Sequence, residues 1–161
     1  MMSISTARGF TLVELLITLA ILGLLASLAV PTIQITFKRQ KEHELKSALR
    51  EIRHAIDAYK LAVDANKISH KADESGYPPD LTLLYKGVED ASDPSHKKKI
   101  YFLRRLPRDP FYPDSTAAPD QTWGKRSYES DYDHPKEGQD VYDIYSYAPG
   151  EGLNGIPYKD W

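Results

Sequence analysis

The most informative ionisable residue in the sequence is Glu14, because it lies inside a long apolar segment. Between residues 1 and 37 the only charged side chains are those of Arg8 and Glu14. A carboxylate in hydrocarbon costs about 2.5–3.5 kcal/mol on insertion scales and normally has a partner. Cleavage after Gly9 would give Phe10 a free α-amine four residues before Glu14. This amine could pair with the Glu14 carboxylate of its own chain or of a neighbouring chain, and pairing with a neighbour would favour the stacking of subunits.

Other residue patterns with possible chemistry give no support for an enzyme. The sequence has no cysteine, which excludes disulfides, thiol catalysis and thiolate zinc sites. Its five histidines show no metal-ligand spacing, and no GxSxG motif is present. Gly150, Gly152 and Gly155 match the pattern GxGxxG, but no βαβ unit can follow so near the end, so we expect these glycines to shape a loop. The balance of 21 basic and 23 acidic residues argues against a nucleic-acid partner.

The apolar segment that contains Glu14 extends over residues 10–37. As a helix, its 28 residues would cover roughly 40 Å, more than the ~30 Å of a bilayer's hydrocarbon core. A secretory signal cleaved near residues 26–29 is the alternative. Glu14 inside the segment and a helical pattern that continues past Pro31 count against that alternative. Positive charges flank both ends, so they do not decide the orientation.

An amphipathic helix is predicted directly after this segment. Its apolar positions recur at intervals of three and four residues, at Leu45, Leu49, Ile52, Ile56, Tyr59 and Val63. Glycine and proline are absent between residues 38 and 66. We therefore expect one continuous helix of about 55 residues, in which Pro31 is the place for a bend because it lacks a backbone donor.

The remainder, residues 67–161, is predicted to form a globular α+β region with a C-terminal loop. A turn at residues 76–80 precedes a short helix that Asp80 caps. Strands are expected near residues 125–130 and 140–148, and the alternation of residues along the second range fits a strand without identifying its buried face. A small antiparallel sheet packed on the amphipathic helix would bury the apolar stripe of that helix.

The nine residues Arg8-Gly-Phe-Thr-Leu-Val-Glu-Leu-Leu16 resemble the processing site of type IV pilins and type II secretion pseudopilins. In that family a prepilin peptidase cuts between Gly and Phe and N-methylates the new terminus. The resemblance implies that residues 1–9 are a leader peptide, that the chain is cleaved between Gly9 and Phe10, that Phe10 is N-methylated and that Glu14 acts in assembly.

Later stretches resemble the major pseudopilin branch of this family. They are Tyr77-Pro78, Leu106–Phe111, Trp123–Tyr128 and Asp143–Ser146 before a Gly-rich terminal loop. In that branch the Asp-Pro-aromatic and Trp-Gly elements usually merge, whereas here residues 112–122 separate them like an insertion. The implied architecture is an α+β pilin fold, with a long N-terminal helix packed against a small antiparallel β-sheet. Its membrane-spanning half would be residues 10–37 and its amphipathic half residues 38–66.

The same branch commonly binds calcium in its terminal loop, between aspartates and backbone carbonyls. Such hard oxygen ligands suit calcium. The implied ligands in this sequence are Asp143, Ser146, Glu151, Asn154 and Asp160. Pro149 occupies a place where the branch has an aspartate, so a loop held by glycine turns and by the packing of Trp161 is the alternative.

The resemblance implies a structural protein that leaves the inner membrane and joins a periplasmic pseudopilus for type II secretion. The implied partners are further copies in a helical filament, the prepilin peptidase, minor pseudopilins, the inner-membrane assembly platform and the membrane itself. A type IV pilin or minor pilin for adhesion, motility or DNA uptake is an alternative in the same structural class. A single-pass membrane-anchored enzyme or binding protein is a remote alternative, which would need neither cleavage after Gly9 nor Glu14.

Overall fold

The structure is a computed structural model that describes residues 9–95 and 97–161, with the side chains of residues 28–32 left out. Residues 1–8 of the expected leader and His96 therefore lie outside the described residues. The chain divides into two compact units, one up to Arg39 and one from Gln40 to Trp161.

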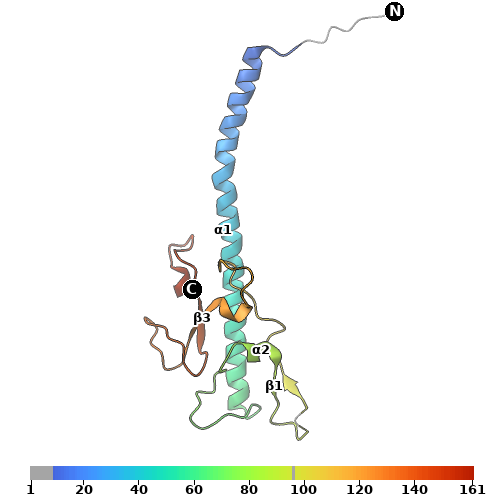
Figure 1. Cartoon of the computed structure of the whole chain (residues 1–161), viewed down its shortest axis with the longest axis vertical. Coiled ribbons are helices and arrows are strands. Elements are labelled where there is room, and N and C mark those ends of the chain that lie inside the picture. Colours follow the sequence, from blue (N-terminus) through green and yellow to red (C-terminus); the bar gives the residue numbers. More distant parts are fainter. Residues whose placement is uncertain (1–8, 96) are drawn as a thin grey trace, which may run out of the picture. The chain divides into compact units, whose positions relative to one another are not determined.

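Helix α1 extends over Leu12–Asp64 and comprises 53 residues, which confirms the prediction of one long helix (Figure 1). Its first turn is capped by Thr11, whose Oγ1 accepts a hydrogen bond from the backbone N–H of Glu14 at 3.2 Å. The helix continues through Pro31. It ends where Asn66 adopts a left-handed φ of 56°, a conformation that stops α-helices.

In the unit up to Arg39, the large apolar side chains between Phe10 and Leu25 are exposed. Among the described residues, no helix combines the length and the apolar character that crossing a membrane requires. The expected membrane segment 10–37 includes residues 28–32, whose side chains lie outside the description. A membrane span over residues 10–37 therefore stays a prediction.

The second unit contains the short elements of the fold. Helix α2 and two two-stranded antiparallel sheets follow α1 along the chain, and the short 3₁₀ helices η1 and η2 accompany them. The bounds are α2, Thr82–Lys86; β1, Val88–Glu89; β2, Lys99–Ile100; η1, Pro119–Gln121; β3, Trp123–Arg126; β4, Asp143–Ser146; and η2, Tyr158–Asp160. Strand β3 pairs with β4 and β1 with β2. The α+β fold is confirmed, while the sequence did not predict the β1–β2 pair.

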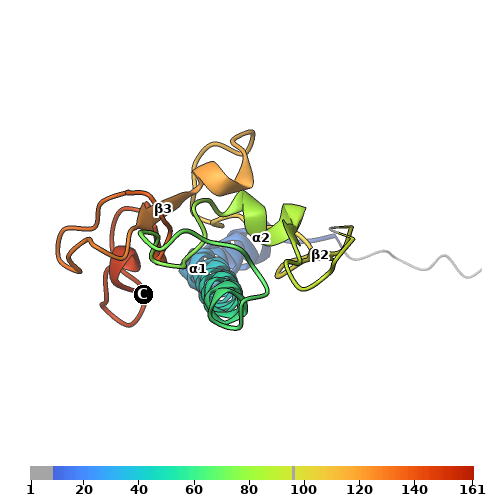
Figure 2. The same cartoon turned by 90° about the horizontal axis from the view of Figure 1, so that it is seen from below.

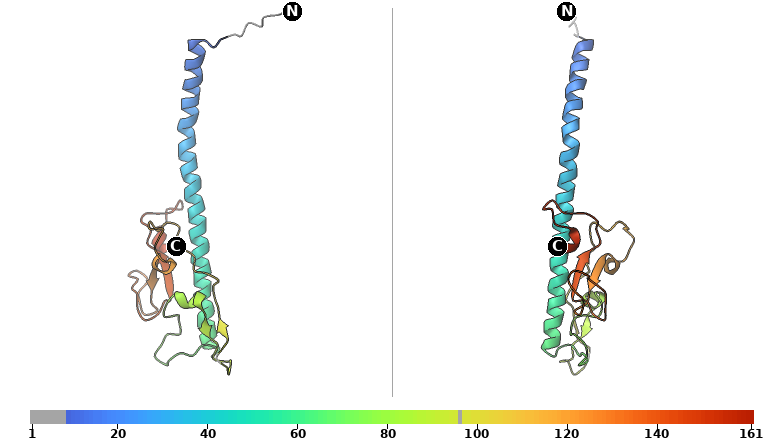
Figure 3. Two further views of the ribbon diagram at one scale, coloured as in Figure 1. Left: turned by 45° about the vertical axis from the view of Figure 1, so that its right-hand side comes forward. Right: turned by 90° about the vertical axis from the view of Figure 1, so that its left-hand side faces the viewer.

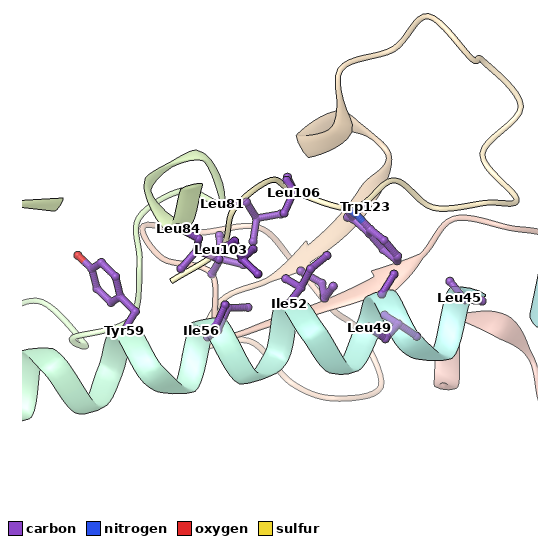
Figure 4. Packing of buried hydrophobic residues seen from close by; sticks show 14 of the residues in the cluster. Leu45, Leu49, Ile52, Ile56, Tyr59, Leu81, Leu84, Leu103, Leu106 and Trp123 are labelled. Atoms are coloured by element: carbon purple, nitrogen blue, oxygen red, sulfur yellow. The ribbon is translucent and has the colours of Figure 1, made fainter. Parts of the chain in front are cut away.

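The hydrophobic core lies between the second half of α1 and these elements. In Figure 2, α2 and β3 lie on the same side of α1. Figure 4 shows the apolar stripe of α1 facing side chains from the rest of this unit. Leu45, Leu49, Ile52 and Ile56 are at most 2% exposed, and they pack in one cluster with Leu81, Leu84, Leu103, Leu106 and Trp123. The predicted burial of this stripe is therefore confirmed.

Trp123 also fixes the start of the β3–β4 sheet. Its indole N–H donates a hydrogen bond to the carbonyl of Pro107 at 2.9 Å, so this buried side chain leaves no polar atom unpaired. Residues 112–122, which resemble an insertion, are held by Arg108 just before them, because its guanidinium donates to the carbonyl oxygens of Asp114, at 2.7 Å, and Ala117. These residues thus form a loop that leads through η1 into β3.

Candidate functional site

The expected cleavage position lies just before α1. Gly9 and Phe10 are exposed and not helical. A Cβ atom built on Gly9 would meet no other atom of the described chain within 4 Å, and its φ is outside the left-handed region that favours glycine. Neither the packing nor the backbone of this chain therefore requires glycine at this position. A requirement for Gly9 would have to come from a partner that binds the extended segment.

Glu14 lies in the first turn of α1 and is exposed. Its backbone N–H is the group that Thr11 caps, so Thr11 and Glu14 occupy the first and last positions of a capping-box sequence. A carboxylate here also interacts favourably with the positive end of the helix dipole. Among the ion pairs of residues 9–95 and 97–161, none includes Glu14. The Thr11 cap was missed by the sequence analysis, although a Thr-x-x-Glu pattern before an apolar run is its usual signal.

A second constellation lies on α1 within the unit from Gln40 to Trp161. Glu42, Lys46 and Arg53 are separated by four and seven residues, which places them on one face of the helix. All three contact the C-terminal segment, residues 143–161, and Figure 3 shows η2 of this segment beside α1. We call this set of three α1 side chains the α1 clasp.

The first member of the α1 clasp is a buried carboxylate. Glu42 is 8% exposed, and its Oε1 accepts hydrogen bonds from the backbone N–H of Leu153 at 2.9 Å and from the Tyr158 hydroxyl at 3.0 Å. Two donors compensate for the burial of this carboxylate. Glu42 thereby ties the terminal loop to the helix.

The other two members are cations. The Lys46 ammonium lies 4.3 Å from the centre of the Trp161 ring, within the range of a cation–π contact. The Arg53 guanidinium donates to Oδ1 of Asp143 at 2.7 Å and to the main-chain oxygens of Ile144, at 3.1 Å, and Trp161, at 2.7 Å. Arg53 therefore joins strand β4 to the last residue of the segment.

The loop between β4 and η2 is shaped by its glycines, as expected from the GxGxxG pattern. Gly150 and Gly155 have φ values of 91° and 73°, a conformation that only glycine adopts without strain. At Gly152, an added Cβ would lie 2.2 Å from the Trp161 ring. The three glycines thus permit a tight loop that packs under Trp161.

Three of the expected calcium ligands have other partners in this structure. Asp143 is paired with two guanidinium groups. The Ser146 hydroxyl donates to the buried Asp109 carboxylate at 2.5 Å, and the Asn154 side-chain oxygen accepts from the N–H of Ile156 at 3.2 Å.

The remaining two expected ligands, Glu151 and Asp160, lie in other local structures. Glu151 forms a β-bridge with Pro157, and Asp160 lies exposed in η2. Within residues 9–95 and 97–161, no three acidic, histidine or cysteine side chains come together as metal ligands would. Calcium needs six to eight converging oxygens, and in this structure Asp143, Ser146 and Asn154 of the implied set bind other groups.

Ionisation of Tyr158 is expected to lower the stability of this unit at alkaline pH. Burial and the hydrogen bond to Glu42 raise the pKa of Tyr158 to about 12, above the value of about 10 in unfolded chains. The contribution of the neutral phenol to folding is complete below pH ~10 and is lost as the pH rises toward ~12. Tyr158→Phe should reduce the free energy of unfolding by about 1.5–3 kcal/mol at pH 8, and this deficit should shrink above pH ~10.

Urea unfolding of the full chain in detergent micelles at pH 8, 10 and 11.5 measures this difference. Tyr101→Phe is the matched control, because the ring of Tyr101 is 63% exposed. A Tyr158→Phe deficit that stays constant over this pH range would contradict the assignment.

Known proteins are similar to this chain both in the N-terminal segment and along nearly the full length. Residues 4–30 match the family described as "Prokaryotic N-terminal methylation motif". The type II secretion system core protein G of Klebsiella pneumoniae is 32% identical over 154 residues, which are 93% of this chain and 87% of that protein. The core protein G of Pectobacterium carotovorum is 31% identical over 152 residues, 92% of this chain and 79% of that protein.

A third relative, the core protein G of Dickeya chrysanthemi, is 29% identical over 157 residues, covering 95% of this chain and 82% of that protein. No solved structure is significantly similar to the chain. The match to the methylation motif and the similarity along nearly the full length lead to one assignment. The chain belongs to the family of the type II secretion system core protein G, the major pseudopilin, and is a structural protein rather than an enzyme.

Proposed function

We propose that this chain is the repeating subunit of a periplasmic pseudopilus that drives protein secretion across the outer membrane. The observation that carries the proposal is the similarity to core protein G along 93% of the chain, together with the methylation motif at residues 4–30. The fold supports a structural role, because the second unit has a single hydrophobic cluster built on α1.

The proposed maturation takes place at the exposed segment before α1. A prepilin peptidase cleaves between Gly9 and Phe10 and methylates the new amine of Phe10. Three residues separate this amine from Glu14 in the first turn of α1. The amine and the carboxylate then have opposite charges at the start of every subunit.

The proposed assembly step uses these two charges between subunits. A carboxylate within the membrane is costly when it has no partner. Pairing of Glu14 with the Phe10 amine of the incoming subunit removes this cost at the growing end of the filament. The exposure of Glu14 and the lack of any described ion pair to it support this role.

The proposed location is supported by the methylation motif at residues 4–30 and by the relatives along the chain. Residues 10–37 hold the subunit in the inner membrane before assembly, and the unit from Gln40 to Trp161 lies in the periplasm. The proposed partners are other copies of the chain, the prepilin peptidase, minor pseudopilins and the inner-membrane assembly platform. A type IV pilin would share this maturation but would extend a surface filament.

Electron microscopy of cells that overproduce the chain together with its secretion machinery tests the proposal. We expect filaments that are labelled by antibodies against this chain, and secretion should stop when the chain is deleted. The matched control is the same strain without prepilin peptidase, which should show neither filaments nor secretion. Normal secretion in the deletion strain would contradict the proposed function.

A further inference from the structure

The Arg53 guanidinium binds Asp143, which is one of the five residues that the resemblance implies as calcium ligands. It contacts one carboxylate oxygen, that of Asp143, and the main-chain oxygens of Ile144 and Trp161, at 2.7–3.1 Å. A carboxylate and backbone carbonyls are also the donors that calcium takes in protein loops. We infer that Arg53 replaces a divalent cation in this chain, and that residues 143–161 fold on α1 without a metal ion.

The charges around Asp143 support this replacement. Arg126 of β3 approaches the second oxygen of the same carboxylate at 3.4 Å, and its guanidinium carbon is held 4.8 Å from the centre of the Tyr142 ring. Two guanidinium groups therefore neutralise the one carboxylate of the implied calcium set that lies in a strand. A divalent cation at Asp143 would be repelled by both.

The planar guanidinium of Arg53 suits the arrangement of its three acceptors. Its side chain is 36% exposed and that of Asp143 25%, so the pair is only partly screened by water. A planar guanidinium presents several N–H donors in fixed directions, and Arg53 uses two of its nitrogens for three acceptors. This connects the start of the segment, at β4, with its last residue.

The rest of the α1 clasp fixes the segment between these points. Glu42 binds the Leu153 N–H and the Tyr158 hydroxyl, and Lys46 lies over the Trp161 ring. Together with Arg53, these side chains hold both ends and the middle of residues 143–161 on α1. The folding of the segment is therefore expected to be indifferent to calcium.

Hydrogen–deuterium exchange of the full-length chain in detergent micelles tests the inference. In the wild type, amides of residues 147–161 should exchange at the same rate in EDTA and in millimolar calcium. Arg53→Gln should speed this exchange at least about tenfold in both buffers, while α2 remains protected. Arg50→Gln is the matched control, because Arg50 is an exposed arginine on the same helix whose Nε donates within α1, to the Lys46 carbonyl.

The comparison of wild-type exchange in EDTA and in calcium needs no variant. It can therefore overturn the inference even when Arg53→Gln does not fold. Calcium that slows the exchange of residues 147–161 in the wild-type chain would overturn it. So would an Arg53→Gln chain whose segment exchanges at the wild-type rate in EDTA. The milder variant Arg53→Lys keeps the charge but loses the fixed donor geometry, and it should give an intermediate exchange rate.

Discussion

Gly9→Val is expected to leave the chain uncleaved in the inner membrane. Valine at this position has free space in the chain itself, because a Cβ on Gly9 meets nothing within 4 Å. The expected defect therefore arises in the peptidase, where a branched side chain displaces the scissile bond. A displacement of about 1 Å is enough to slow an enzymatic step roughly a hundredfold.

Intact-mass spectrometry of the membrane fraction measures the outcome. The wild-type chain should begin at Phe10 and carry one added methyl group, whereas Gly9→Val should retain its first nine residues. Gly23→Val is the matched control, since an added Cβ at Gly23 also meets nothing within 4 Å, and this variant should be cleaved. A natural mature chain that still begins at Met1 or Met2, in cells with active prepilin peptidase, would refute the proposed maturation.

The sequence predicted those parts of the fold that depend on local periodicity. The three- and four-residue spacing from Leu45 to Val63 predicted both α1 and its buried stripe, because such a pattern leaves one apolar face on a helix. Asp80 was expected to cap a short helix, but the N-cap position of α2 is Leu81, which has no side-chain cap; Asp80 lies one residue earlier, and its Oδ1 accepts from the N–H of Thr82 at 2.7 Å. The strands β3 and β4 were placed to within a few residues.

The α1 clasp was beyond prediction from the sequence, because its contacts join distant residues. Arg53 and Asp143 are 90 residues apart, and Glu42 and Tyr158 are 116 apart. On the helix, Arg53 reads as one of many charged residues beside the apolar stripe. From the sequence, Asp143 suits the role of a calcium ligand and that of a salt-bridge partner equally well. Only the folded structure, which places it beside Arg53 and Arg126, favours the second role.

Glu14→Leu is expected to abolish filament assembly while the subunit is still inserted and cleaved. Loss of the charge removes the insertion penalty of about 2.5–3.5 kcal/mol, so the amount of monomer should not fall. The Phe10 amine of an incoming subunit would then lack its partner. Breaking an ion pair in a medium of low dielectric constant costs about 3–5 kcal/mol, which is more than a hundredfold in an association constant.

Two further variants separate this electrostatic role from the capping of α1. Glu14→Gln retains an acceptor that suits a capping box but removes the charge, so it should fail to assemble as Glu14→Leu does. Thr11→Ala removes the hydroxyl that accepts from the Glu14 N–H and keeps the charge. It should lower helix stability by about 1 kcal/mol without abolishing filaments.

The ratio of sheared filament to membrane-bound monomer, in wild type and Glu14→Gln, tests the central claim most directly. Both pools are quantified by immunoblot from the same cells, and intact mass confirms that each chain begins at Phe10. We predict wild-type monomer levels and no filament for Glu14→Gln. Filaments of normal abundance from correctly processed Glu14→Gln chains would contradict the pairing of Glu14 with the Phe10 amine as the basis of assembly.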